Sequence, residues 1–156
     1  MSHECGCPGA RMQDFTAEET AATEEHGTRQ SQLRQWPVQL HLVSPAAPYY
    51  KGADVVLAAD CVAYAVGDFH KDHLQGKSLA IACPKLDDGQ DVYVQKIKSL
   101  IEDAEINTLT VMIMEVPCCH GLLDLATQAA AASSRKVPVK ATTISLRGEV
   151  VSERWA

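Results

Sequence analysis

The stretch LTVMIMEVPCCHGLLDLATQAAAA, residues 109–132, decides the fold. Its first part, residues 109–116, is an apolar run of the kind found in strands that are buried on both faces of a parallel sheet. Pro117 ends this strand, because it lacks the backbone N–H group that a sheet ladder needs. The Leu- and Ala-rich residues that follow predict a helix from about Cys119 to Ala132. The stretch therefore reads as a strand, a sharp turn with two adjacent cysteines, and a helix.

Further strand-like segments lie on both sides of this unit. DVVLAAD (54–60) and SLAIA (78–82) are short apolar runs that predict two more buried strands. Residues 38–43 alternate apolar and polar side chains, which predicts a half-exposed strand. Residues 139–146 predict the last strand, with a turn at Arg147-Gly148.

Helical segments separate the later strands. Residues 62–74 predict a helix that stops before Gly76. Asp87 or Asp88 is expected to cap a helix that runs to about Asp103. Its apolar residues fall on one helical face: Val94, Ile97, Leu100 and Ile101. Strands joined by helical crossovers predict a three-layer α/β domain. We expect a mainly parallel sheet of about five strands, flavodoxin-like or Rossmann-like in outline.

The chain divides into an arm and a domain. Residues 1–32 form an acidic N-terminal arm that contains Cys5 and Cys7, and residues 33–156 form the α/β domain. In the arm, DFTAEETAATEEH (14–26) contains no lysine or arginine and has poor hydrophobic periodicity. This composition favours a solvated segment over a packed one.

The overall charge and hydropathy limit the classes of function. The formal net charge is −6, which argues against a general nucleic-acid role, because phosphate binding needs a basic face. No apolar run approaches the roughly 20 residues of a membrane span, and the N-terminus has no apolar signal segment. We therefore expect a cytoplasmic protein that binds neither nucleic acid nor membrane. The sequence leaves a homo-oligomer open.

Four cysteines directly follow predicted strands: Cys61, Cys83, Cys118 and Cys119. The carboxyl ends of parallel strands share one edge of a sheet, and sites of open α/β folds form there. Cys118 and Cys119 also lie at a predicted helix start, where free N–H groups favour negative sulfur. Clustered cysteines in a reducing cytoplasm indicate metal binding or redox chemistry. The sequence therefore predicts four thiols that converge at one edge.

Several kinds of site use such a set of thiols. An iron–sulfur cluster accepts four cysteines from scattered loops, and the expected form is [4Fe-4S]. Zinc is an alternative, although structural zinc sites commonly use CxxC pairs, which this chain lacks. Thiol or cluster catalysis on a small sulfur or disulfide substrate is another. The simplest interpretation is that these are ordinary buried cysteines at strand ends.

Other residues are expected to support the metal. Cys7 is a reserve or fifth ligand, favoured over Cys5 because Pro8-Gly9 predicts a turn beside it. Three histidines, His120, His70 and His73, are expected near the ligands, where an imidazole tunes a metal centre or carries protons.

Four segments carry a resemblance to a known family: CPGARM (7–12), residues 31–70, LAIACPKLDDGQ (79–90) and TVMIMEVPCCHGLL (110–123). The longest of them reads SQLRQWPVQLHLVSPAAPYYKGADVVLAADCVAYAVGDFH. The chain resembles iron–sulfur cluster-binding proteins of anaerobic bacteria and archaea, in the region that follows a two-cluster ferredoxin domain in longer members. The resemblance implies electron transfer, a redox partner such as a ferredoxin or an oxidoreductase, and anaerobic metabolism. The CxxCxxC run of the ferredoxin part is absent, and His120 stands where relatives tend to have glycine.

A weaker resemblance concerns the paired cysteines. Cys83, a gap of 34 residues and then Cys118-Cys119 is similar to the first half of the cysteine-rich motif of heterodisulfide reductase catalytic subunits. In that motif, adjacent cysteines help to hold non-cubane clusters. The closing CxxC of the motif is missing here, so the resemblance implies cluster ligation by paired cysteines and no disulfide-reductase activity.

Overall fold

The computed structural model describes residues 27–156, and its centre is a five-stranded sheet in the order β2-β1-β3-β4-β5. The first four strands in the chain are parallel, and the last is antiparallel to its neighbour β4. The strands are β1 (Asp54–Ala59), β2 (Ser78–Ala82), β3 (Thr108–Met114), β4 (Val139–Ile144) and β5 (Val150–Trp155). The predicted α/β class and mainly parallel sheet are confirmed.

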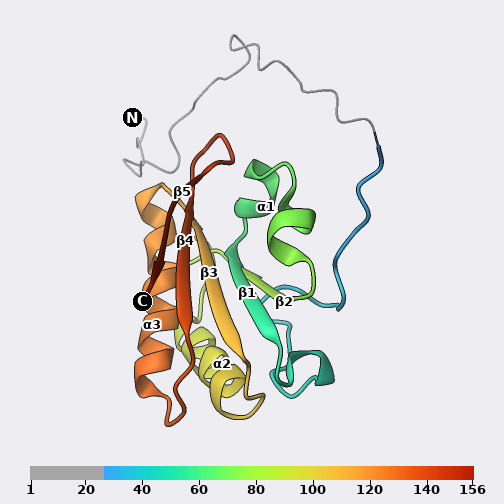
Figure 1. Ribbon diagram of the computed structural model, residues 1–156. Helices are drawn as coiled ribbons and strands as arrows, with labels where there is room; N and C mark the ends of the chain where they lie inside the picture. Colours follow the sequence, from blue (N-terminus) through green and yellow to red (C-terminus); the bar gives the residue numbers. More distant parts are fainter. Residues whose placement is uncertain (1–26) are drawn as a thin grey trace.

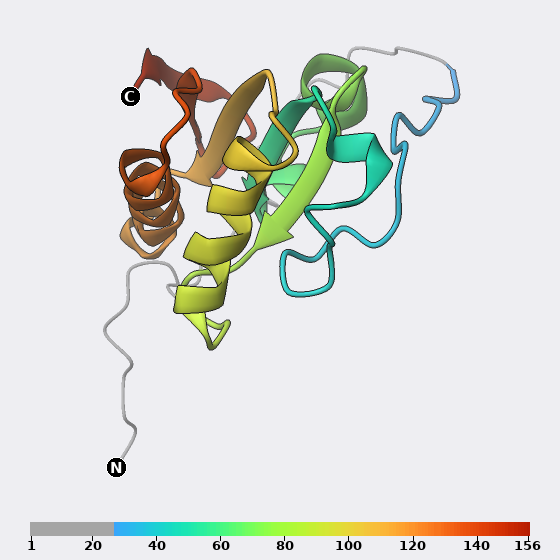
Figure 2. The ribbon, with the colours of Figure 1, turned by 90° about the horizontal axis from the view of Figure 1, so that it is seen from below.

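Helical elements cover both faces of the sheet and make the three layers (Figures 1 and 2). One face carries α1 (Val62–Ala65) and the π-helix η3 (His70–Leu74), which together connect β1 to β2. The other face carries α2 (Gln90–Glu102) and α3 (His120–Ala132), which pack against each other. Two short 3-10 helices complete the order: η2 (Pro48–Tyr50) and η4 (Pro117–Cys119).

The core follows from the apolar strands at the centre of the sheet. In β1 every residue after Asp54 is buried, and in β3 the last four residues are buried. Helix α2 turns one face inward with Tyr93, Ile97 and Leu100, each no more than 1% exposed. Each such side chain contributes about 2 kcal/mol relative to an exposed one. This rigid centre fixes the carboxyl ends of β1, β2 and β3.

Residues before β1 cover the outer edge of β2. The Gln35 side chain acts like a strand backbone: its Nε2 donates to the Leu79 carbonyl oxygen, and its Oε1 accepts from the Leu79 N–H at 3.1 Å. Ile81 continues the pairing, because its N–H donates to Val38 and its oxygen accepts from Leu40 at 2.8 and 2.9 Å. At the opposite side, β5 has no further strand beside it within residues 27–156.

The predicted strand at 38–43 is wrong. Only Gln39 forms an isolated parallel bridge, to Ile81, and the chain then turns, because the N–H groups of Leu42 and Val43 both donate to the Gln39 oxygen. The ammonium group of Lys96 closes this turn. Its Nζ donates to the carbonyl oxygens of Leu40, His41 and Val43 at 2.9, 2.6 and 2.9 Å. The alternating apolar and polar side chains of residues 38–43 therefore belong to a turn that is held against α2 by Lys96.

Two other segments differ from the prediction. The helix expected over 62–74 is broken, because α1 ends at Ala65 and Val66 has extended backbone angles before η3 begins. Strand β5 was not predicted, since all six of its residues are exposed and give no apolar pattern. Among the helices of the described chain, none has both the length and the apolar content to cross a bilayer.

Candidate functional site

The cysteines of the described residues lie just past the carboxyl ends of three parallel strands. Cys61 follows β1, Cys83 follows β2, and the pair Cys118-Cys119 lies in η4 after β3. The register pairs Ala59 with Ala82, so the loops of Cys61 and Cys83 leave the sheet at nearly the same level. No disulfide joins the four within residues 27–156. The predicted placement on one sheet edge therefore matches the structure.

Cys119 is the buried member of the set and occupies the N-cap position of α3. Burial, together with the neighbouring Cys118 and Cys61, raises the pKa of its thiol to about 11, and a backbone hydrogen bond with Met114 offsets only part of this rise. The expected thiolate at this helix start is wrong for Cys119, because loss of hydration outweighs the helix dipole. The same interactions place the thiols of Cys118 and Cys61 within electrostatic reach of Cys119.

Cys83 belongs to a separate hydrogen-bonded group. Its N–H donates to Asp87 Oδ2 at 2.9 Å, and the Asp87 N–H donates back to the Cys83 oxygen at 2.9 Å. The buried Tyr93 hydroxyl donates to the same carboxylate oxygen, and burial and Asp87 hold the pKa of Tyr93 above its usual range. Asp87 therefore fixes the Cys83 loop and does not cap α2, whose N-cap is Gly89 at φ +70°.

The two thiol-bearing regions meet at Gly121 and Pro84. A Cβ atom at Gly121 would lie 3.2 Å from the Cβ of Pro84, which is closer than ordinary van der Waals contact. The absence of a side chain at Gly121 thus lets the loop after β2 pack directly on the first turn of α3. This contact holds the Cys83 loop beside the Cys118-Cys119 segment.

The thiols share an edge but do not form a ready metal site. Within residues 27–156, no group of three or more His, Cys, Asp or Glu side chains is arranged to hold a metal ion. Cys5 and Cys7 lie outside the described residues. The donor chemistry of the edge suits a thiophilic metal, and electrostatic interactions link Cys119 to Cys118 and to Cys61.

The three histidines lie in different places. His120 is the exposed first residue of α3, directly after the cysteine pair. His70 and His73 lie in η3 on the opposite face of the sheet. Burial lowers the pKa of His73. Its charged neighbours are Asp72, Lys77, Glu153 and Lys140. His73 therefore lies toward the β4–β5 pair, and His70 lines a cavity.

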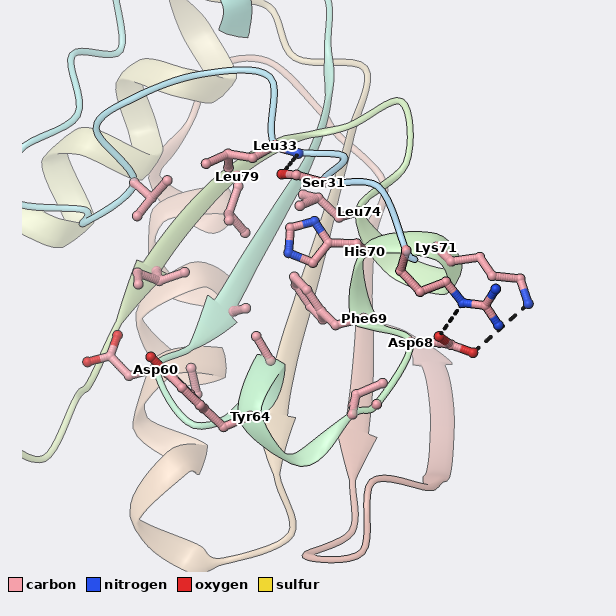
Figure 3. A pocket seen from close by; sticks show the side chains of 18 of the residues that line it. Ser31, Leu33, Asp60, Tyr64, Asp68, Phe69, His70, Lys71, Leu74 and Leu79 are labelled. Carbon is pink, nitrogen blue, oxygen red and sulfur yellow. Dashed lines mark hydrogen bonds and ion pairs between the residues drawn. The ribbon is translucent and has the colours of Figure 1, made fainter. Parts of the chain in front are cut away.

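That cavity has a volume of about 540 Å³ and lies between the sheet, α1, η3 and residues 29–33 (Figure 3). The rings of His70 and Phe69 project into it, with Asp60 at one end and Asp68 and Lys71 at the other. Its walls are mainly apolar side chains of β1, β2 and η3. The only sequence feature that indicated this cavity was the charged segment DFHKDH (68–73). Hydrophobic periodicity could not predict that the helix expected over residues 62–74 is broken and leaves a cavity beside it.

Sequence comparison agrees with this architecture. The model of the family described as "Rossmann-like domain" matches residues 47–156. The chain belongs to this family. The matched residues include all five strands, α1, α2, α3 and the four described cysteines.

One relative of this Rossmann-like domain is an uncharacterized protein of Archaeoglobus fulgidus. It is 38% identical over 91 residues, which cover 58% of this chain and 63% of the relative. The chain thus matches less than two thirds of that protein's length. No solved structure matches the chain.

The raised pKa of Cys119 predicts slow alkylation. At about pH 8, a thiol with a pKa of about 11 has roughly one thousandth of its molecules as the reactive thiolate. In the reduced, metal-free Rossmann-like domain, we expect iodoacetamide to modify exposed Cys61 first. The rate at Cys119 should rise about tenfold per pH unit up to about pH 10. Timed quenching and peptide mass spectrometry measure both rates.

Protein unfolded in urea is the control for this measurement. There the cysteines lose their separate environments, so their alkylation rates should become similar. Rapid modification of Cys119 in the folded protein, with no dependence on pH, would contradict its buried and protonated state.

Proposed function

We propose that the chain is a redox protein that holds an iron–sulfur cluster, in the [4Fe-4S] form, at the carboxyl edge of its sheet. The ligands are Cys61, Cys83, Cys118 and Cys119, with Cys7 in reserve. The observation that carries the proposal is the presence of thiols on three strand-end loops of one edge, with Cys118 and Cys61 both in electrostatic reach of Cys119. Iron–sulfur clusters are held by cysteine thiolates, and these ligands can come from separate loops.

Loading the cluster requires two changes at the edge. The Cys119 thiol is protonated at neutral pH, with a pKa of about 11, so metal binding must displace its proton. The thiols must also move closer together, because no group of three or more His, Cys, Asp or Glu side chains within residues 27–156 is arranged to hold a metal ion. The contact of Pro84 with Gly121 supports this step, because it already holds the two loops together.

The surface around the edge suits a protein partner in a reducing cytoplasm. Tyr64 in α1 is 94% exposed, and Leu86 in the loop after Cys83 is 81% exposed. Exposed aromatic and apolar side chains are common at the centre of protein interfaces. The net charge of −6 favours a basic docking surface on the partner. We propose a ferredoxin or an oxidoreductase as the partner, in anaerobic metabolism.

Anaerobic reconstitution tests the cluster. The full chain is incubated with iron, sulfide and a thiol reductant and then desalted. We expect a brown protein with about four irons and four sulfides per chain, and an electron paramagnetic resonance signal after reduction by dithionite. Serine in place of any one of the four proposed ligands should remove at least about half of the bound iron, since oxygen is a weaker cluster ligand than thiolate.

Cys5→Ser is the matched control, because Cys5 lies outside the proposed ligand set, and it should leave the iron content unchanged. A colourless wild-type protein after reconstitution would overturn the proposal. Stoichiometric zinc in protein purified anaerobically would replace it with a zinc-bound interaction module. Iron content equal to that of the wild type in all four serine variants would show that iron binds elsewhere.

A further inference from the structure

We propose that the cavity beside η3 binds a small uncharged carbonyl compound, a mainly apolar molecule whose carbonyl oxygen accepts hydrogen bonds from His70 and Ser31. The cavity volume of about 540 Å³ lies within the range of small-molecule pockets, which is about 300–1,000 Å³. The residues that line it include none of the described cysteines. The site is therefore separate from the thiol edge and does not rest on the proposed cluster.

Small residues make room for the apolar part of the ligand. Ala58 and Ala59 end β1, and Ala63 of α1 faces the same space. The broken helix adds to the cavity, because α1 stops before Val66, whose backbone is extended. Phe69 supplies a buried apolar wall. These surfaces favour a hydrocarbon or aromatic body over a sugar or a nucleotide.

His70 presents a hydrogen-bond donor to the ligand. The Gln32 backbone N–H donates to His70 Nδ1 at 3.0 Å, so the proton of the neutral ring lies on Nε2. Among residues 27–156, Nε2 has no hydrogen-bond partner, and the ring projects into the cavity (Figure 3). A ligand oxygen that accepts from Nε2 therefore completes the hydrogen bonding of the imidazole.

Ser31 supplies a second donor in the same part of the cavity. It is the residue before Gln32, whose N–H contacts the His70 ring, and its side chain lines the cavity (Figure 3). Ser31 Oγ accepts from the Leu33 N–H at 3.2 Å, and its O–H has no acceptor within the part of the chain that the structure describes. Two such donors suit a carbonyl oxygen, which has two lone pairs and no proton to donate.

The charged side chains around the cavity already have partners in the chain. Arg29 Nε lies 3.1 Å from Asp68 Oδ1, and Lys71 Nζ lies 4.0 Å from Asp68 Oδ2. At the other end of the cavity, Asp60 Oδ1 accepts from Gln39 Nε2 at 3.5 Å. An ion that entered between the apolar walls would lose its hydration and would compete with these contacts. An uncharged ligand is therefore favoured over a carboxylate or an amine.

NMR titration of the isotope-labelled full chain with 4-phenylbutan-2-one tests the site. We expect saturable binding with a dissociation constant of about 1 mM or tighter, and the largest shift changes at the amides of Phe69 and His70. 4-Phenylbutyrate and 4-phenylbutylamine are the matched charged probes, and each should bind at least about fivefold more weakly than the ketone. No binding of the ketone, or binding of either ion as tight as that of the ketone, would overturn the proposal.

Two variants test the donors, with ethylbenzene as a probe that enters the same apolar space without an oxygen. His70→Asn keeps an acceptor near the position of Nδ1 for the Gln32 N–H and removes the Nε2 donor, so ketone affinity should fall about fivefold. Ser31→Ala should lower it about threefold. Ethylbenzene affinity should change less than about twofold in both variants, because a hydrocarbon makes no hydrogen bond. Equal losses for the two probes would overturn the assignment of the donors.

Ala63→Trp tests the location of the binding. Ala63 is exposed and lines the cavity, so the indole ring should fill the space and abolish binding of both probes. Ser152→Ala is the control, since Ser152 is exposed in β5 and does not line the cavity, and its affinities should equal those of the wild type. Circular dichroism and thermal melting confirm the fold of each variant.

Wild-type ketone affinity in Ala63→Trp would place the binding elsewhere and overturn the proposal. None of these measurements depends on iron content, so failure of this site is distinguishable from failure of the proposed cluster.

Discussion

Replacing Gly148 with alanine is expected to lower the free energy of unfolding by about 2–4 kcal/mol, because two separate costs add. Gly148 has φ +85°, a left-handed angle that costs a residue with a side chain about 1 kcal/mol. A Cβ atom there would also lie 2.1 Å from the carbonyl oxygen of Ala65. Since that oxygen belongs to backbone, the β4–β5 turn must move away from α1, at a cost of about 1–3 kcal/mol.

Two other glycines separate these costs in urea unfolding experiments. Gly67→Ala should change stability by less than about 0.5 kcal/mol, because its Cβ meets nothing within 4 Å and its φ is ordinary. Gly52→Ala should lower the free energy of unfolding by about 1 kcal/mol through the backbone angle alone, because Gly52 has φ +63° and no atom lies within 4 Å of its Cβ position. If Gly148→Ala is no worse than Gly52→Ala, the close approach of the turn to α1 is contradicted.

Asp87→Ala is expected to destabilise the chain by about 3 kcal/mol. The carboxylate accepts from the Cys83 N–H and from the Tyr93 hydroxyl, and each hydrogen bond to a charged group contributes about 1.5–3 kcal/mol. Tyr93 is fully buried, so without Asp87 its hydroxyl loses the side-chain acceptor that it has in the folded protein. The loop that carries Cys83 should then become mobile.

A double-mutant cycle with Tyr93→Phe isolates the interaction of Asp87 with the hydroxyl. We expect a coupling energy of at least about 1 kcal/mol from urea unfolding. Asp88→Ala is the matched control, since its side chain is an exposed neighbour, and it should change stability by less than about 0.5 kcal/mol. Additive effects of Asp87→Ala and Tyr93→Phe would contradict the shared hydrogen-bond network.

The buried parts of the fold were predictable from sequence because burial leaves a pattern. The segments 54–60, 78–82 and 109–116 are continuous apolar runs, and each covers all or nearly all of a strand of the sheet. Residues 139–146 likewise contain β4. Strand β5 left no pattern, because it gains its order from backbone pairing with β4 and not from burial.

The misassigned segments were decided by contacts between distant residues. Residues 38–43 alternate like a strand, yet Lys96, far along the chain, binds three carbonyl oxygens of this segment and holds it as a turn. The break after Ala65 coincides with the approach of Gly148 to the end of α1. Such contacts depend on the assembled structure, so local propensity could not predict them.

The candidate site was predictable in position and not in chemistry. Topology alone places Cys61, Cys83 and Cys118 at one edge, because parallel strands bring their carboxyl ends together. The protonation of Cys119 depends on how deeply its sulfur is buried. Its position at a helix start, which the sequence does predict, gives no information on this burial. The carboxylate of Asp87 was expected at a helix cap, but it binds Cys83 and Tyr93, because α2 begins later, after Gly89.

The two sides of the sheet differ in a way that limits how chains can polymerise. Gln35 and the residues after it occupy the outward-facing backbone groups of β2, whereas β5 is an outermost strand of the sheet formed by residues 27–156. Of the two sheet edges that residues 27–156 form, β5 is therefore the one at which a second chain can add by strand pairing. In a pair of chains joined at β5, the outer edges of the combined sheet would be the two β2 strands. The outward-facing backbone groups of β2 already have hydrogen-bond partners within the same chain. Edge-to-edge growth of the sheet formed by residues 27–156 would then stop at a pair of chains.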